Sequence, residues 1–87
     1  MNNQDWFVYI AETESGHYYT GVSNDVAKRI DKHNSGKGAK FARMHSGFVL
    51  VYQSQAMSKS DALKREAEIK TWTKLKKLKY ITGEIND

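Results

Sequence analysis

The chain contains no cysteine and no proline among its 87 residues. The missing cysteine excludes a disulfide framework and a thiolate metal site, and it agrees with a reducing compartment. No apolar stretch approaches the roughly 20 residues of a membrane span, and the start of the chain (MNNQDWFVYI) lacks the features of a signal peptide. We therefore expect a cytoplasmic protein with no membrane partner.

The excess of positive over negative charge is also small. Fourteen Lys and Arg face ten Asp and Glu, which gives a net charge of +4. This excess permits a polyanionic partner without requiring one. A chain of this length has room for one modest core, so we expect residues 1–87 to form a single domain whose function lies on one small platform.

Three apolar runs predict the strands of a small sheet. Residues 6–11 are continuously apolar and aromatic, which is typical of a central strand buried on both faces. Residues 12–16 (ETESG) are polar and end in glycine, and residues 17–22 are again aromatic and β-branched, which predicts a hairpin with a short loop. Residues 48–52 (FVLVY) predict a third strand.

A first helix is predicted to follow the hairpin. Val26 and Ile30 lie one turn apart and give it an apolar side, with Ser23 or Asn24 as N-cap and an end near residues 34–36. The segment 36–47 has three glycines, no steady period and the basic residues Lys37, Lys40, Arg43 and His45. It is typical of a long loop, either an ordinary flexible loop or one that contacts phosphate.

A second helix is predicted from a capping box at residues 58–61 (SKSD) to about Trp72, and a short helix or basic tail follows. The predicted class is therefore α+β, with the order ββαβα plus a C-terminal extension. Trp72 could pack against that extension or offer a stacking surface. The core is expected to include Trp6, Phe48, Val51 and Ile69.

A carboxylate lies within the apolar side of the second helix. On a helical wheel that starts at Leu63, Glu66 falls between Leu63 and the apolar pair Ala62 and Ile69. Burying an unpaired carboxylate costs several kcal/mol, so Glu66 requires a cation, a metal ion or strong donors. Lys70, one turn later, is the simplest partner.

The first helix carries two further candidates. Arg29 and His33 flank its apolar side and are directed along the sheet surface where Tyr9 or Tyr19 emerges. A hard oxygen ligand such as Glu66 beside a basic, tyrosine-bearing surface suits Mg²⁺, which often takes one or two protein carboxylates and leaves its other positions to water and phosphate. The set outlines a phosphodiester site, in which the arginine would meet developing negative charge.

These residues form an ordered pattern. The strand motifs FVY (residues 7–9) and YTG (residues 19–21) precede Arg29 on the first helix and Glu66 on the second. The pattern resembles the GIY-YIG nuclease superfamily. The segments HNSGKGAKF and ALKREAEIKTW are similar to its small stand-alone bacterial proteins, and the resemblance covers about residues 6–78.

The resemblance implies a ββαβα core with a three-stranded antiparallel sheet, one divalent ion (Mg²⁺, with Mn²⁺ as the other candidate), and hydrolysis of nucleic-acid phosphodiesters, of DNA in the first place. It implies a structure-selective role in DNA repair or processing, with specificity drawn from substrate shape, a protein partner or a homodimer. The implied roles are metal binding for Glu66, phosphate stabilisation for Arg29, general base for Tyr19, positioning or proton transfer for Tyr9, and orientation of water or phosphate for His33. Lys37, Lys40, Arg43 and Lys70 are the candidate nucleic-acid contacts.

Two positions depart from the superfamily pattern. Phe7 replaces the first glycine of the name motif, and Val22 stands where some repair members carry a lysine. The second departure leaves His33 or Lys37 to supply the missing cation, or leaves catalysis slow.

Other functions fit the same residues. The fold could serve a nucleic-acid-binding module with little or no turnover, or a scaffold whose charges only keep it soluble. Tyr9 and Tyr19 could be ordinary strand tyrosines, and Arg29 and His33 could form structural pairs, because such pairs imitate sites. The basic residues Lys74, Lys76, Lys77 and Lys79 could be a solvated helix face or add sequence-independent affinity.

Overall fold

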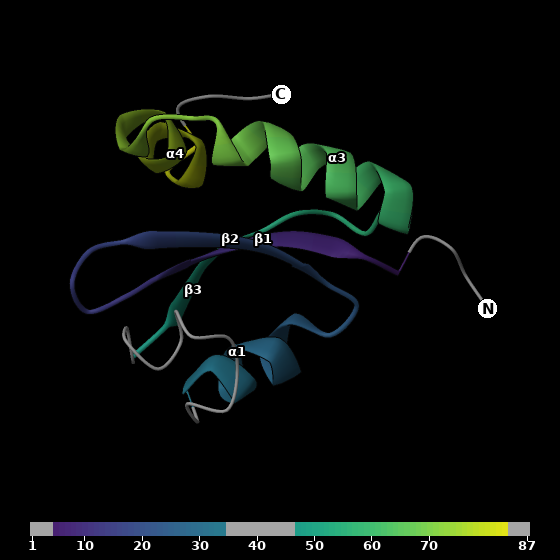
Figure 1. The fold of residues 1–87 in the computed structure, drawn as a ribbon, viewed down its shortest axis with the longest axis horizontal. Helices are drawn as coiled ribbons and strands as arrows, with labels where there is room; N and C mark the ends of the chain where they lie inside the picture. The colour runs from purple at the N-terminus through teal and green to yellow at the C-terminus, as the bar shows by residue number, and fades with distance from the viewer. Residues whose placement is uncertain (1–4, 35–46, 84–87) are drawn as a thin grey trace.

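The computed structural model describes residues 5–34 and 47–83. These residues form a three-stranded antiparallel sheet with α1 on one face and α3 and α4 on the other (Figure 1). The strands are β1 (Phe7–Glu12), β2 (Tyr18–Ser23) and β3 (Val49–Gln53), and the helices are α1 (Val26–Asn34), α3 (Lys59–Lys70) and α4 (Lys74–Ile81). The predicted α+β class and ββαβα order are confirmed, and the C-terminal extension is a helix.

β1 is the central strand, because the sheet order is β2-β1-β3. Its four residues from Val8 to Ala11 are fully buried, as the continuous apolar run predicts. The hairpin turn between β1 and β2 is closed by two backbone hydrogen bonds, from Thr13 N to His17 O (2.9 Å) and from Gly16 N to Thr13 O (2.9 Å). Gly16 has φ +85°, a conformation that favours glycine.

Successive side chains of β1 point to opposite faces of the sheet, so this strand contributes to two separate hydrophobic cores. Val8 and Ile10 face α3 and pack with its Ala62 and Ile69. On the opposite face, Ala11 packs with Phe48, Tyr19 and Ile30. Of the residues assigned to the core from sequence, Phe48 and Ile69 are buried, whereas Trp6 and Val51 are only partly buried.

Two details of the helix predictions were wrong. The N-cap of α1 is Asp25, whose Oδ1 accepts from Lys28 N (3.1 Å), and Ser23 cannot take this place because it still pairs with Phe7 in the sheet. Leu63 does not belong to the buried side of α3, since it is 47% exposed. The inner side runs through Ala62 and Ile69 instead, which lie about two turns apart.

The boundaries of α3 and α4 agree closely with those predicted from the sequence. Ser58 caps α3 and accepts from Asp61 N (3.1 Å), as the capping box predicts, and α3 ends at Lys70 because Thr73 already caps α4. Trp72 packs against α4, with its ring centroid 5.1 Å from that of Tyr80, which decides between its two predicted roles. The predicted basic loop lies largely outside the described residues. Among the helices that the structure describes, none is long and apolar enough to cross a membrane.

Candidate active site

The Tyr9 side chain lies across β2. The strand register pairs Tyr9 with Gly21, and an atom at the Cβ position of Gly21 would be 2.6 Å from the Tyr9 hydroxyl oxygen. Only glycine therefore leaves room for the ring. In the next pair on this face the large residue comes from the other strand, with Ala11 of β1 opposite Tyr19 of β2. These large–small pairs bring the two tyrosine rings side by side, with centroids 6.2 Å apart.

His33 joins this aromatic cluster from α1. Its Nε2 is hydrogen-bonded to the Tyr9 hydroxyl (3.2 Å), and its ring centroid lies 4.9 Å from that of Tyr19, edge to face. Phe48 closes the cluster with its centroid 5.0 Å from His33 and 5.8 Å from Tyr19. The candidate residues of β1, β2 and α1 are thus one packed group.

Asn34 holds Phe48 in this position. Its side-chain Nδ2 donates to Phe48 O (3.1 Å), and its Oδ1 accepts from Phe48 N (2.7 Å). This pair of hydrogen bonds ties the end of α1 to the chain just before β3. These bonds fix the backbone of Phe48 and therefore the position of its ring beside His33.

Charges from both faces of the sheet act on the Tyr9 hydroxyl. Burial raises its pKa above the ordinary value of 10.0, Tyr19 and Glu66 raise it further, and Arg29 lowers it. Arg29 comes from α1 on one face and Glu66 from α3 on the other.

His33 is held in its neutral form. Its pKa is lowered first by burial and then by the positive charges of Arg29 and Lys32. Its Nδ1 is buried and has no hydrogen-bond partner within the described part of the chain. Because burial and two neighbouring cations disfavour its charged form, His33 is a poor source of the positive charge that is missing at Val22, which itself packs on the α3 side.

Arg29 lies in α1, one turn before His33. Its side chain is exposed and lines a polar hollow of about 200 Å³. The other lining residues are Ser23, Asn24, Asp25, Lys28 and Lys32. Two lysines next to an accessible guanidinium make this hollow suited to an anion.

Comparison with known proteins gives a match to one family model. Residues 5–79 match the model of the GIY-YIG catalytic domain. The chain belongs to the GIY-YIG family. Members of this family are generally endonucleases, typically depend on a divalent metal ion and act on nucleic acid.

The relatives of this GIY-YIG protein include several small bacterial proteins. It is 52% identical over 75 residues to a UPF0213 protein of Staphylococcus epidermidis, covering 86% of this chain and 92% of the relative. A solution structure of a UPF0213 protein of Bacillus halodurans is 42% identical, has a TM-score of 0.57 and covers 88% of this chain and 82% of that one. A second solution structure, of a protein from E. faecalis, is 27% identical with a TM-score of 0.61 and covers 100% and 95%.

The ligands available at this GIY-YIG site fit one divalent ion that is shared between a protein carboxylate and a substrate phosphate. Glu66 is partly buried, with 21% of its side chain exposed, and it forms an ion pair with Lys70 (3.4 Å). The lysine is 56% exposed, so this pair is weak and the ammonium can move away. Residues 5–34 and 47–83 contain no group of three His, Asp or Glu that could form a metal cage. A single carboxylate suits Mg²⁺, which keeps water and phosphate as its other ligands.

The structure thus packs Tyr9, Tyr19 and His33 together, and the charges of Arg29 and Glu66 act on the Tyr9 hydroxyl. Lys70 lies beside Glu66, whereas Lys37, Lys40 and Arg43 lie outside the described residues.

The sequence pattern includes Gly21 only as the last residue of the YTG motif, without a role, and it does not identify Phe48 and Asn34 as parts of this site. For Gly21 the hairpin register was the available signal, because it places a glycine opposite Tyr9. No periodicity links Asn34 to Phe48, so the sequence contained no comparable signal for that contact.

Proposed function

We propose that this protein is a Mg²⁺-dependent endonuclease that hydrolyses phosphodiester bonds in DNA. The observation that supports this most directly is the convergence on the Tyr9 hydroxyl. This one buried group is hydrogen-bonded to His33 and feels the charges of both Arg29 and Glu66, which come from opposite faces of the sheet. A cation and a carboxylate around a tyrosine pair can bind a phosphodiester and a divalent ion together.

Arg29 and Glu66 would share the binding of the scissile group. Glu66 would hold the divalent ion, whose chemistry here is to polarise the phosphoryl oxygens. Arg29 would donate to a non-bridging oxygen and stabilise the negative charge that grows there in the transition state. Its exposure in the polar hollow leaves it free to reach the substrate.

The tyrosines and His33 would handle the water. The raised pKa of Tyr9 keeps it protonated at neutral pH, so it serves as a positioning group with His33 rather than as a base. Tyr19 is then the candidate general base. The water oxygen would form a bond to phosphorus as its proton passes to the phenolate oxygen of Tyr19, which must first have given up its own proton to solvent. The bond to the leaving oxygen would break, with that oxygen taking a proton from solvent.

A nucleic-acid-binding module with little turnover is the second candidate. Val22 removes one cation that some repair members have, and His33 is a poor source of that charge. The basic hollow at Arg29 would still bind phosphate in such a module.

Cleavage of a panel of labelled DNAs separates the two functions. Single-stranded, duplex and branched substrates are incubated with Mg²⁺, Mn²⁺ or EDTA and with wild type, Arg29→Ala or Glu66→Ala. We expect metal-dependent cleavage by wild type that both variants lose, with Glu66→Ala still binding DNA. Salt-sensitive binding without cleavage by any of the proteins would instead favour the binding module. Preference for branched substrates would indicate a role in DNA repair or processing.

A further inference from the structure

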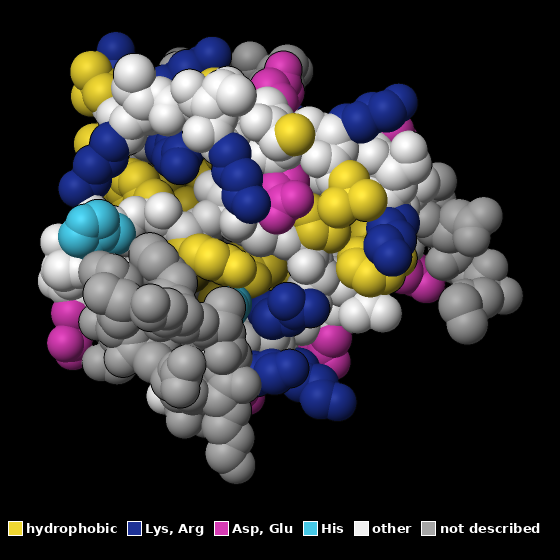
Figure 2. Space-filling view, in the orientation of Figure 1, with side chains coloured by type: hydrophobic (Ala, Val, Ile, Leu, Met, Phe, Trp, Pro, Cys, Tyr) yellow, Lys and Arg dark blue, Asp and Glu magenta, His cyan; other side chains and the backbone are white. Residues whose placement is uncertain are grey.

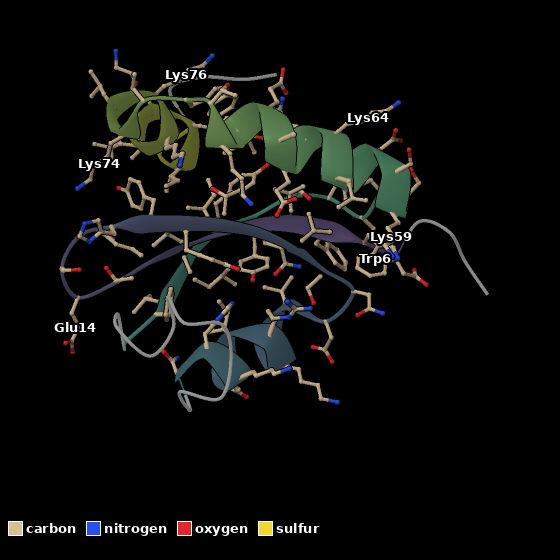
Figure 3. All side chains as sticks on the ribbon, in the orientation of Figure 1. Trp6, Glu14, Lys59, Lys64, Lys74 and Lys76 are labelled. Carbon is tan, nitrogen blue, oxygen red and sulfur yellow. The ribbon has the colours of Figure 1, made fainter. Side chains whose placement is uncertain are left out.

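A second hollow lies farther along the β2 edge, away from Arg29. It has a volume of about 230 Å³ and is lined by Gly16, His17 and Tyr18 from the hairpin and by Lys74 and Lys77 from α4. Figure 3 shows Lys74 extending from α4 toward the hairpin end of the sheet, and its Nζ lies 5.6 Å from the centre of the Tyr18 ring. In Figure 2, Lys and Arg side chains gather at this end of the face around exposed hydrophobic atoms.

The positive charges of this hollow continue to the candidate active site. The pKa of Lys77 is lowered first by burial and then by the positive charge of Lys70. Lys70 in turn pairs with Glu66 (3.4 Å). α3 and α4 lie on the same face of the sheet (Figure 1), so Lys70, Lys77 and Lys74 are all on the side of Glu66, and the last two line the hollow at Tyr18.

Lys74 and Lys77 are not balanced by an ion pair within the described part of the chain. Among residues 5–34 and 47–83, the ion pairs are those of Lys70 with Glu66 and of Arg65 with Glu68, and neither includes Lys74 or Lys77. Holding Lys77 partly buried beside another cation costs free energy in the protein alone. A bound anion would relieve this repulsion.

We propose that Lys70, Lys77 and Lys74 form a phosphate-binding track for a single-stranded nucleic-acid segment that flanks the scissile phosphodiester. This proposal rests on the proposed nuclease function and adds where the substrate strand runs. Successive phosphates would lie on the lysines, and a sugar or base would contact the Tyr18 ring. Lysines combined with an aromatic ring in one hollow are typical of single-strand binding.

α4 provides a matched control. Lys76 and Lys79 are exposed on the same helix and change the net charge equally, but neither lines the hollow. Lys76 points away from the sheet in Figure 3, and its Nζ lies over the Trp72 ring, 4.5 Å from the centroid. The double variants Lys74→Gln/Lys77→Gln and Lys76→Gln/Lys79→Gln therefore differ in position and not in charge.

The test is the salt dependence of binding to a labelled DNA single strand, measured by fluorescence anisotropy in EDTA. Losing two phosphate contacts should reduce the slope of log K against log salt by about 1.4, because each single-strand contact contributes ~0.7. We expect Lys74→Gln/Lys77→Gln to bind about 25-fold more weakly than wild type at 0.1 M salt. The control should stay within about threefold of wild type. Circular dichroism checks that both variants are folded.

Equal weakening by the two double variants would overturn the track, because it would mean that only the net charge matters. Absence of salt-sensitive binding by wild type would overturn it as well. Because EDTA prevents metal-dependent cleavage, the result is independent of the nuclease assay. If the salt dependence confirms the track but wild type does not cleave DNA, only the nuclease function is refuted. If wild type cleaves DNA but the two double variants bind it equally well, only the track is refuted.

Discussion

At the scale of single residues, the site depends on the close approach of Tyr9 to Gly21. A methyl group at residue 21 would overlap the Tyr9 ring, with 2.7 Å to Cζ, so the ring would have to leave its place beside His33. We expect Gly21→Ala to lower the free energy of unfolding by about 1–3 kcal/mol, as overpacking does, and to weaken cleavage. Urea denaturation measures the first effect and a cleavage assay the second.

The double variant Tyr9→Leu/Gly21→Ala is the control for this prediction. Removing the ring removes the overlap, so Gly21→Ala should cost less in the Tyr9→Leu background than in wild type. An equal cost in both backgrounds would show that the strain does not come from Tyr9.

Thr20 provides a prediction of opposite sign. Its hydroxyl is buried on the α3 side and has no hydrogen-bond partner among the described residues. Thr20→Val keeps the shape and removes an unsatisfied polar atom, so we expect the free energy of unfolding to rise by about 1–2 kcal/mol in urea denaturation. A fall in stability would mean that the hydroxyl makes a stabilising contact after all.

His33 predicts how stability depends on pH. Because the pKa of His33 in the folded protein lies below its ordinary value of 6.5, the unfolded chain binds its proton more readily. Stability is then fully present above about pH 6.5 and is lost as the pH falls toward the folded-state pKa. Urea denaturation across this range should show a steeper loss for wild type than for His33→Gln. Equal pH dependence in the two proteins would contradict the burial of a neutral His33.

At the scale of secondary-structure elements, α4 is attached without any fully buried residue of its own. Its Tyr80 hydroxyl is hydrogen-bonded to the Tyr52 hydroxyl of β3 (2.6 Å) and accepts from Arg65 of α3 (3.2 Å). The Arg65 guanidinium also lies over the rings of Trp72 and Tyr80, 5.3 Å from each centroid. Arg65 precedes Glu66 in α3, so the same contacts hold the helix that carries the candidate metal ligand.

A double-mutant cycle tests this attachment. Tyr80→Phe and Tyr52→Phe each remove one partner of a hydroxyl pair, and each should cost about 1–2 kcal/mol of unfolding free energy. The double variant should cost less than the sum of the two, because it leaves no lone hydroxyl behind. Strict additivity would show that the two hydroxyl groups do not stabilise each other.

At the scale of the whole molecule, the sequence predicts the elements better than their approach to one another. The apolar runs identify three strands, and the capping box at Ser58 identifies the start of α3. Hydrophobic periodicity also places Glu66 on the inner side of its helix. These features depend on local patterns, which one sequence contains.

The contacts that complete the site depend on register and on long-range approach. Tyr9 fits over Gly21 only when β1 and β2 pair in one register, and Asn34 meets Phe48 across a segment of the chain that has no periodicity. Lys74 and Lys77 could be separated from Lys76 and Lys79 only once the position of α4 against the hairpin was known. Such contacts are set by tertiary packing, and propensity does not report them.

The most direct test of the central claim is the single-turnover rate of DNA cleavage in Mg²⁺ by wild type, Glu66→Gln and Glu68→Gln. Both variants remove one carboxylate from α3, but Glu68 pairs with Arg65 away from Tyr9. A bound metal ion contributes several kcal/mol to the transition state, so we expect Glu66→Gln to be at least ~100-fold slower and Glu68→Gln to stay near the wild-type rate. Equal rates for Glu66→Gln and wild type would contradict a metal site at Glu66 and with it the proposed active site.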